Sequence, residues 1–467
     1  MAILHGLTPA PVESCRVLEI ACSDGANLIP IAYAAPAAEF VGFDLARLPV
    51  ERGQRRIAEL GLRNVRLFQM DLLEAGADLG RFDYIIAHGL YAWSPEPVRD
   101  RLLALTGELL TDEGVAFISY NTMPGGHLRS MMREMMLFGG KGVEDPEQEV
   151  MEGLKFLHLL AGVLPEGDIY RALLESQLQR MEKHNLAAIR HDELSDVYHP
   201  VHFADFVEHA RRHGLQYISE AQLPPPTDPS YRAEMQSALL NKAGRDFLSQ
   251  EQLLDFVRMR GYRETLLCRA DRVVQRGFPA EHFQRLLLSS QTTAEPGKTP
   301  GAMAFVLPGG VRMESNHPGV TALLRELGEA WPRALAWEEL EPLLAEAGLA
   351  LNADGATLLI RLAVAKMIEL RAWNPPVART IAERPRASAC SRHEAATQTQ
   401  VTTLLHTTAS FDDAKLRRLL TLLDGTRDRR GLLEAMGRDF PEVSQAELEA
   451  GIELGLQLFL RGGVLES

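Results

Sequence analysis

Residues 16–45 read RVLEIACSDGANLIPIAYAAPAAEFVGFDL, and this stretch decides the fold. The pattern predicts a strand, a turn of small residues that opens a helix, and a second strand that ends in an acid. In folds that bind dinucleotides, small residues in the first turn let the backbone approach the ligand, and an acid about 20 residues later binds the ribose hydroxyls. Asp44 holds the position of that acid. We therefore expect a site for an adenosine-bearing cofactor.

Glu19, at the end of the first strand, separates two classes of cofactor. A carboxylate just before the turn repels the pyrophosphate of a nicotinamide cofactor. S-adenosylmethionine carries no phosphate but has a sulfonium and an amino group, so an acid is compatible with it. The segment EIACSDG, residues 19–25, therefore indicates the first motif of a class I methyltransferase. The alternative is an ordinary strand-to-helix turn in an α/β domain.

Composition limits the classes of function. A chain of 467 residues predicts two to four domains, and 46% hydrophobic with 24% charged residues is typical of a globular protein. The net charge of −14 argues against a nonspecific nucleic-acid binder. The scattered cysteines lack the CxxC spacing of a zinc site and suit a reducing compartment. No apolar run approaches the roughly 20 residues of a membrane span, and no signal peptide precedes residue 16, so we expect a cytoplasmic protein.

Polar residues follow five successive predicted strands. After Asp44 the pattern predicts a helix from about 49 to 60, then strands at 65–69, 82–87 and 115–120. The carboxyl ends of parallel strands meet at one edge of the sheet, where ligands bind. We expect five side chains to gather there: Glu19, Asp44, Asp71, His88 and Asn121. The alternative is that strand ends are polar only because loops are.

The later chain completes the predicted sheet and adds further domains. A helix over 202–210 leads into a strand at 215–220, and a last strand at 264–270 returns antiparallel. Two polar segments, 290–301 and 376–399, are typical of linkers. The resulting fold class is α/β, a Rossmann-like sheet with a helical insertion and C-terminal winged-helix-like domains. The predicted limits are 1–138 and 198–278 for the catalytic domain, 139–197 for the insertion, 279–375 for a regulatory domain, and 376–467 for the C-terminal domain.

Position in the sheet predicts a role for each candidate residue. The methionine half of the cofactor is expected against Glu19, Ala21, Ser23, Gly25 and Asn27. Asp44 is expected on the ribose, Asp71 and Leu72 beside the adenine, and His88 where cofactor and acceptor are oriented. The candidates for contact with the acceptor are Tyr91 and Trp93, an aromatic wall for an ammonium group, and Tyr120 and Asn121. For His88 a purely structural role is an equal alternative, and for Trp93 packing against the following helix is the favoured alternative.

No metal site is predicted. His199, His202, His209 and His213 are close in sequence, but their spacing crosses Pro200 and they lack nearby cysteine or acid partners.

Several segments together resemble a known family. They are LEIACSDGANLIPIAYA, FVGFDL, FDYIIAHGLYAWSP, GVAFISYNTMPGG, HGLQYISEAQLP, DFVRMRGYRETLLCRAD and LLDGTRDRRGLL. The chain resembles bacterial S-adenosylmethionine-dependent methyltransferases that carry a methyltransferase regulatory domain, the group that includes rickettsial protein lysine methyltransferases. The resemblance implies a class I methyltransferase core, a largely helical middle region that can mediate a homodimer, and C-terminal domains that help recognise a protein substrate.

The sequence departs from the family in two places. Ala21 and Ser23 replace glycines of the first motif, where positive φ is less favourable for a residue with a side chain. The chain opens at MAILHGLTPAP, where relatives carry a longer segment rich in Tyr, Pro and His. The leading expectation is a protein lysine methyltransferase. The alternatives are a methyltransferase of a small molecule or RNA, and a non-catalytic scaffold that binds partner proteins.

Overall fold

A seven-stranded sheet lies at the centre of the computed structural model, which describes all residues except 184, 224–236, 238–240, 243 and 245. The strand order is β3-β2-β1-β4-β5-β7-β6. Strands β1 to β5 are parallel, and β7 runs antiparallel to both β5 and β6. The predicted fold class, including the antiparallel last strand, is confirmed. The bounds are β1 Arg16–Ile20, β2 Glu39–Asp44, β3 Val65–Gln69, β4 Phe82–Ala87, β5 Leu110–Asn121, β6 Leu215–Glu220 and β7 Tyr262–Arg269.

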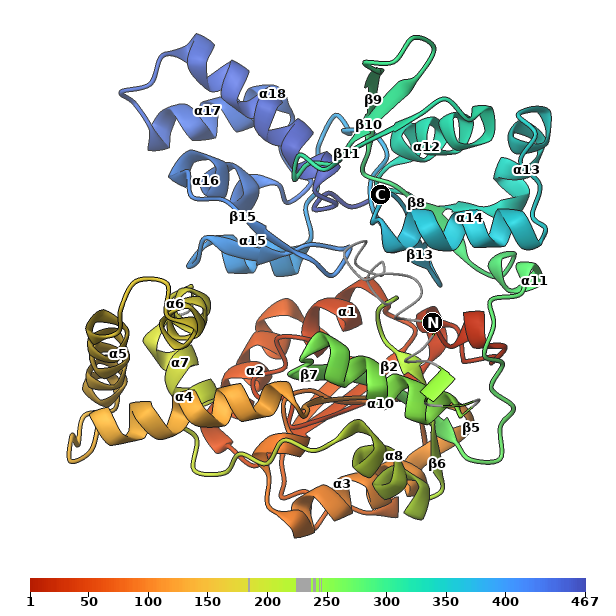
Figure 1. Ribbon diagram of the computed structural model, residues 1–467. Helices are drawn as coiled ribbons and strands as arrows, with labels where there is room; N and C mark the ends of the chain where they lie inside the picture. Colours follow the sequence, from red (N-terminus) through yellow and green to blue (C-terminus); the bar gives the residue numbers. More distant parts are fainter. Residues whose placement is uncertain (184, 224–236, 238–240, 243, 245) are drawn as a thin grey trace.

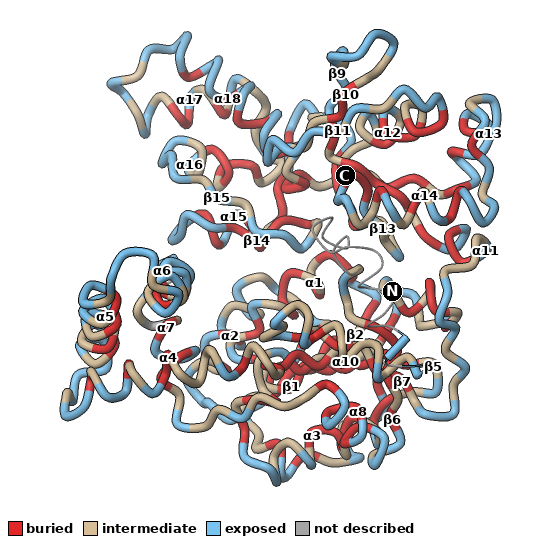
Figure 2. The backbone as a smooth tube through the Cα atoms, viewed as in Figure 1, coloured by how far each residue is buried: buried red, intermediate tan, exposed pale blue. Residues whose placement is uncertain are grey.

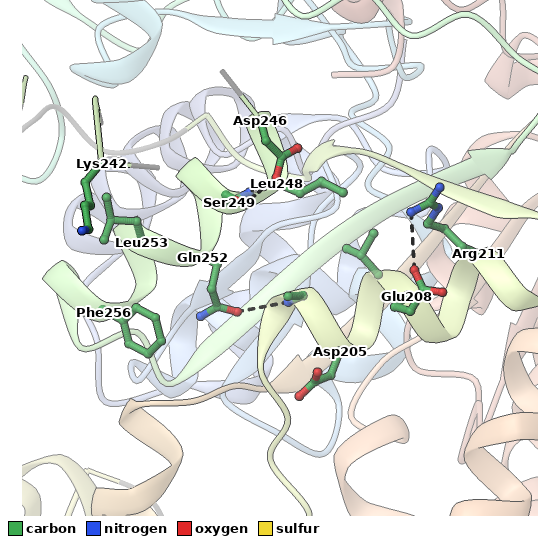
Figure 3. Close-up of a pocket in the computed structure, with 12 residues that line it drawn as sticks. Asp205, Glu208, Arg211, Lys242, Asp246, Leu248, Ser249, Gln252, Leu253 and Phe256 are labelled. Atoms are coloured by element: carbon green, nitrogen blue, oxygen red, sulfur yellow. Dashed lines mark hydrogen bonds and ion pairs between the residues drawn. The ribbon is translucent and has the colours of Figure 1, made fainter. Parts of the chain in front are cut away.

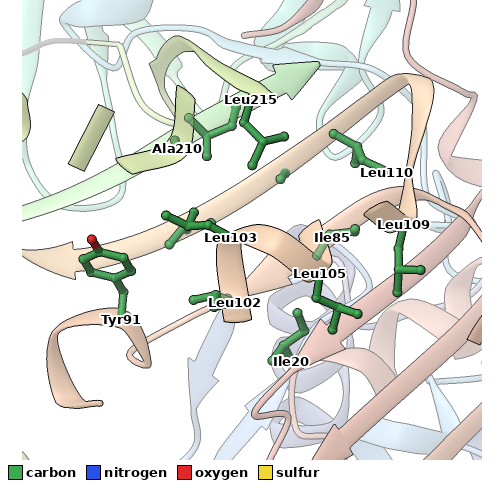
Figure 4. Close-up of a cluster of buried hydrophobic side chains, with 14 of the residues drawn as sticks. Ile20, Ile85, Tyr91, Leu102, Leu103, Leu105, Leu109, Leu110, Ala210 and Leu215 are labelled. Atoms are coloured by element: carbon green, nitrogen blue, oxygen red, sulfur yellow. The ribbon is translucent and has the colours of Figure 1, made fainter. Parts of the chain in front are cut away.

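Helices cover both faces of the sheet. In Figure 1, α1 (Leu28–Ala34) and α2 (Arg47–Leu60) lie above it, and α3 (Glu96–Leu109) and α8 (Phe203–Arg212) lie below it. The leucines of α3 recur at helical spacing, so they form one apolar face that is buried on the sheet beside Ile20 and Ile85 (Figure 4). Helix α10 (Phe247–Arg258) packs beside α8. The two faces therefore have separate cores.

Four helices form a separate group after β5. They are α4 (Gly125–Gly139), α5 (Pro146–Val163), α6 (Ile169–Met181) and α7 (Leu186–Glu193). Their shared core includes Met132, Met136 and Leu157, which have no exposed surface. Asp145 and Asp168 begin α5 and α6 by accepting hydrogen bonds from backbone amides of the first turn. The group thus has its own hydrophobic core beside the sheet (Figure 1).

Small sheets and helices follow the central sheet. The elements are α11 Ala280–Phe283, β8 Leu287–Ser289, β9 Thr293–Pro296, β10 Met303–Val306, β11 Arg312–Ser315, α12 Pro318–Ala330, β12 Leu335–Ala336, α13 Trp337–Glu346, α14 Ala353–Val364 and β13 Glu369–Arg371. The prediction of a linker at 290–301 is wrong, because this segment contains β9 and the buried Ser290 and Thr292. Ser290 Oγ donates to the carbonyl of Met367 at 2.7 Å.

The C-terminal part has a third apolar core. Its elements are α15 Ala389–Ala395, β14 Gln400–Thr402, β15 Thr408–Ser410, α16 Ala414–Leu422, α17 Arg429–Asp439 and α18 Gln445–Arg461. The predicted linker at 376–399 is also wrong, because α15 lies within it and buries Cys390 and Ser391. The backbone is buried in the sheet and along the inner sides of these helices, and it is exposed at the outer turns (Figure 2).

The C-terminal part rests on the α1 side of the sheet. Arg56 of α2 forms an ion pair with Glu394 of α15, and the Tyr33 hydroxyl donates to Glu466. Ala34, Val377 and Leu404 form a small apolar cluster across the same contact. Among the described helices, none combines the length and the apolar character that crossing a bilayer requires.

Candidate functional site

The turn after β1 keeps the backbone of a glycine motif without two of its glycines. The φ angles are 60° at Ala21, 51° at Ser23 and 72° at Gly25, all in the left-handed region. Asp44 holds this turn, because its Oδ2 accepts the Ser23 N–H at 2.9 Å and its Oδ1 accepts the Ala46 N–H at 2.8 Å. The ends of β1 and β2 are thus tied together, as a cofactor turn requires.

Glu19 is a buried carboxylate with one free oxygen. Its Oε1 accepts a hydrogen bond from Asn27 Nδ2 at 3.0 Å. Its Oε2 has no hydrogen-bond partner in the described part of the chain, although the residue is only 5% exposed. Burial raises the pKa of Glu19 to about 7, and the Asn27 hydrogen bond offsets only part of that rise. A cation bound at Oε2 would satisfy this oxygen.

A pocket of about 670 Å³ opens beside Glu19 on the α1 side of the sheet. Glu19, Asn27 and His88 form its polar end. The remaining lining is mostly apolar and includes Val17, Tyr84, Ile86, Phe117 and Leu266 from four strands. An apolar cavity with a few convergent polar groups is the usual form of a cofactor site.

His88 is an exposed residue in the lining of this pocket. Its ring is exposed and stacks on Phe117, with centroids 6.2 Å apart. Its Nδ1 lies 3.1 Å from Ser119 Oγ and 3.4 Å from the Tyr262 hydroxyl. These contacts orient the ring, and its Nε2 has no hydrogen-bond partner in the described part of the chain, so His88 can contact a ligand.

The adenine-side candidates lie outside the lining of the pocket. Asp71 is partly exposed, and its Oδ1 accepts the Leu73 N–H at 2.9 Å. The Leu72 side chain is buried in the core under the other face of the sheet. Asp44 and Asp71 nevertheless follow neighbouring strands at the same edge as Glu19. Their predicted contacts with ribose and adenine stay predictions.

Tyr91 and Tyr120 face the opposite side of the sheet from the pocket. Tyr120 is 1% exposed, stacks on Phe206 with centroids 4.0 Å apart, and its hydroxyl accepts from Thr265 Oγ1 at 3.3 Å. The Tyr91 hydroxyl lies 2.8 Å from His209 Nδ1. Both tyrosines thus belong to the hydrophobic core beneath α3 and α8, and their predicted contact with the acceptor stays a prediction.

Trp93 and Asn121 are also engaged by the protein itself. The Trp93 ring packs against Tyr198 at 4.7 Å, and the Arg129 guanidinium lies 5.1 Å from its centroid. Asn121 is buried, and its Nδ2 donates to the carbonyl of Gly261 at 3.5 Å. The Trp93 ring, predicted to bind the ammonium group of an acceptor, therefore already contacts the guanidinium of Arg129.

His406 is a site residue that sequence reasoning missed. It lies in the turn between β14 and β15 with φ of 57°, and its Nε2 donates to Asn27 Oδ1 at 2.8 Å. Asn27 in turn donates to Glu19, so a chain of hydrogen bonds runs from the C-terminal part to the buried carboxylate. No local motif marks this histidine, because its partner lies 379 positions earlier.

A second pocket of about 660 Å³ lies between α8 and α10, on the other face of the sheet (Figure 3). Some of its polar groups are engaged locally, whereas the buried Gln252 Nε2 has no hydrogen-bond partner in the described part of the chain. Arg211 pairs with Glu208 at 3.4 Å, and Gln252 Oε1 accepts the Ala204 N–H at 3.1 Å. It holds none of the predicted site residues, and we assign no function to it.

Three families match separate parts of the chain. A "Methyltransferase domain" covers residues 17–114, a "Predicted methyltransferase regulatory domain" covers 185–269, and a "PKMT, C-terminal winged helix domain" covers 383–450. The winged helix match confirms that prediction for the C-terminal end of the chain.

Known proteins extend the similarity. The chain is 30% identical over 288 residues to the uncharacterised protein RP789 of Rickettsia prowazekii, covering 61% of this chain and 51% of that one. It is 30% identical over 210 residues to RP028 of the same organism, covering 45% of this chain and 84% of that one. The chain thus spans about half the length of RP789 and most of RP028.

A solved structure shares the whole fold. PKMT2 from Rickettsia typhi in complex with AdoHcy superposes with a TM-score of 0.87 at 22% identity, covering 99% of this chain and 96% of that one. From these matches and the strand order, the chain belongs to the family of class I methyltransferases that carry a methyltransferase regulatory domain and a PKMT-type winged helix domain.

Proposed function

We propose that this protein is an S-adenosylmethionine-dependent methyltransferase. The observation that carries the proposal is the buried Glu19 Oε2, which has no partner in the described structure and borders the pocket. The cofactor has positively charged ammonium and sulfonium groups and no phosphate, so its methionine half suits this oxygen. The AdoHcy bound in the PKMT2 structure, which shares this fold, supports the same cofactor class.

Different residues of the site would bind different parts of the cofactor. Glu19, fixed by Asn27, would hold the positive end of the cofactor, and the turn at 21–25 would let the backbone approach it. Asp44 uses each carboxylate oxygen once for a backbone N–H and keeps lone pairs for ribose hydroxyls. Bound cofactor supplies an electrophilic methyl group. The apolar lining excludes water from the pocket, and the exposed His88 orients what binds there.

We propose lysine side chains of a protein as the acceptor. The support is the resemblance to protein lysine methyltransferases and the PKMT winged helix match over 383–450. An apolar pocket favours this reaction, because desolvation lowers the pKa of a lysine and frees the lone pair that attacks the methyl group. The proposed compartment is the bacterial cytoplasm, supported by four cysteines that are all buried and unpaired.

Calorimetric titration tests cofactor binding. We expect S-adenosylmethionine and S-adenosylhomocysteine to bind wild-type protein, and Glu19→Gln to weaken S-adenosylmethionine by about tenfold or more, because a charge-assisted contact is lost. Glu74→Gln is the matched control, because Glu74 is exposed and outside the pocket. Absence of binding to folded wild-type protein would leave the scaffold alternative in place.

Transfer of label tests the acceptor. The protein is incubated with methyl-labelled S-adenosylmethionine and a bacterial lysate, and the products are treated with nuclease or protease. We expect label that resists nuclease, is released by protease, and is found on lysine by mass spectrometry of peptides. Label in nucleic acid or in small molecules would contradict the proposed acceptor.

We also propose that the four-helix group mediates a homodimer. It exposes several large apolar side chains, namely Leu137, Phe138, Leu159, Val163 and Ile169. Several exposed large apolar side chains on one helical group favour an interaction surface there. Light scattering should show a dimer that Phe138→Ser with Ile169→Ser converts to a monomer. Leu454→Ser, on the exposed side of α18, should leave the dimer intact. A wild-type monomer at micromolar concentration would refute this proposal.

A further inference from the structure

Helices α3 and α8 lie side by side under the sheet and approach each other closely (Figure 1). A Cβ atom on Gly107 of α3 would lie only 2.2 Å from the carbonyl oxygen of His213, so this contact requires glycine. His209 and His213 are separated by one turn of helix, so their side chains share one flank. Asp100 of α3 meets that flank.

The three side chains direct their ligand atoms to one point. Asp100 Oδ1 lies 3.1 Å from His209 Nε2 and 2.8 Å from His213 Nε2. All three atoms lie within 4.8 Å of one another. Tetrahedral zinc with bonds of about 2.0–2.1 Å spaces its ligand atoms roughly 3.3 Å apart. Both measured edges are therefore within about half an ångström of the spacing in a tetrahedral zinc site.

The site is preorganised on one side and open on the other. The side chains of His209 and His213 are 11% and 19% exposed, whereas that of Asp100 is 54% exposed. The Tyr91 hydroxyl is hydrogen-bonded at 2.8 Å to His209 Nδ1, the ring nitrogen that faces away from the cluster. Outer partners of this kind fix the orientation of a metal-binding histidine.

The ligand types narrow the choice of ion. The cluster offers one carboxylate and two imidazole nitrogens. A hard cation such as Mg²⁺ takes mainly oxygen ligands, of which the cluster supplies only one side chain. Imidazole nitrogens and one carboxylate suit a borderline-soft ion.

We propose that Asp100, His209 and His213 bind one Zn²⁺ ion, with water as the fourth ligand. The ion ties α3 to α8 and, through His209, holds Tyr91 in the loop that leaves the pocket at His88. The sequence predicts no metal here, because these histidines lack an acid in ligand geometry among their neighbours along the chain. The fold brings one from 109 positions away.

Metal titration tests the proposal. Full-length protein without a histidine tag is treated with chelator, dialysed, and titrated with Zn²⁺ by calorimetry. We expect one equivalent to bind, and Asp100→Asn and His213→Gln each to weaken binding by about 10–100-fold or more. Substituted Co²⁺ should give the visible absorption of a tetrahedral site. His158→Gln is the control, because His158 pairs with Glu182 on the surface at 2.7 Å and the described part of the chain offers no third ligand there.

Thermal unfolding provides a second readout. One equivalent of Zn²⁺ should raise the Tm of the wild type and of His158→Gln, and leave that of Asp100→Asn unchanged, because an ion that binds only the folded state stabilises it. No Zn²⁺ binding by wild-type protein with a native circular dichroism spectrum would overturn the proposal. Equal affinity in the wild type, Asp100→Asn and His213→Gln would overturn it as well, since the ion would then bind elsewhere.

Discussion

The first turn holds residues with side chains in a conformation that suits glycine. A left-handed backbone costs an ordinary residue about 1–2 kcal/mol, and both Ala21 and Ser23 adopt it. The hydrogen bond from the Ser23 N–H to Asp44 stabilises the turn against this cost. Strain of this kind persists where the surroundings determine the backbone, as they do at binding sites.

Glycine at position 21 should therefore relieve strain. We expect Ala21→Gly to raise the free energy of unfolding by up to about 1 kcal/mol, because the relief exceeds the extra entropy of glycine in the unfolded chain. Urea denaturation measures the change. Ala26→Gly, in the same turn but without a positive φ, should lower stability. A loss of stability in Ala21→Gly equal to that in Ala26→Gly would contradict this account.

Glu19 should destabilise the cofactor-free protein at high pH. Its pKa is about 7 in the folded state against 4.5 for an ordinary glutamate. The folded state therefore binds more protons than the unfolded state between these values, and stability is lost as pH rises through 7. Glu19→Gln removes this dependence, so the variant should gain stability relative to the wild type between pH 5 and pH 8. A stability difference that is constant over this range would refute the assignment.

At the scale of elements, a buried ion network joins β7 to α10 and β6. Arg263 is fully buried, donates from Nε and Nη2 to Asp255 at 2.9 and 2.8 Å, and donates from Nη1 to Glu220 at 2.6 Å. Its guanidinium also lies 3.9 Å from the ring centroid of Phe203 on α8. The network thus fixes the edge of the sheet to the helices that cover it.

Arg263→Met should be strongly destabilising. It removes the closer of the two guanidinium groups that pair with Asp255, which has no exposed surface, and leaves only Arg260, whose Nε lies 3.3 Å from Asp255 Oδ1. We expect a loss of about 3–5 kcal/mol in the free energy of unfolding, measured by denaturant titration. Arg430→Met removes an exposed pair with Glu434 and should change stability by less than about 0.5 kcal/mol. Comparable losses of unfolding free energy in Arg263→Met and Arg430→Met would contradict the claim that burial makes the Arg263 ion pairs important for stability.

The sequence predicted those elements whose signals are local. The strands of the central sheet are apolar runs, and the leucines of α3 repeat at helical spacing, so both were recognisable. The segments taken as linkers are polar, but their polar groups find partners far along the chain. Ser290 bonds to residue 367, and Glu394 pairs with Arg56. His406 and Asp100 could not be recognised as site residues either, because their partners lie far along the chain. Glu19 and Asn27 lie eight positions apart, so local sequence was enough to predict them.

At the scale of the whole molecule, the C-terminal part completes the surroundings of the cofactor turn. It contacts α1 and α2 through Tyr33 and Arg56, and it reaches Asn27 through His406. Trp331 Nε1 donates to the carbonyl of Arg461 at 2.7 Å, which joins the C-terminal part to the domain before it. Changes in the position of the C-terminal part can therefore alter the pocket directly.

The hydrogen bond between His406 and Asn27 gives the last prediction. His406→Gly keeps the left-handed turn but removes the donor that fixes the Asn27 amide, so Glu19 Oε1 loses an oriented partner. We expect S-adenosylmethionine to bind roughly 3- to 10-fold more weakly by calorimetry, the value of one hydrogen bond, with unchanged Tm. His393→Ala breaks another contact across the interface, with Glu59 at 3.7 Å, and should leave affinity unchanged. Equal loss of affinity in both variants would mean that the whole interface, and not the His406 hydrogen bond, sets cofactor binding. Unchanged affinity in His406→Gly would show that the Asn27 amide keeps its orientation without His406.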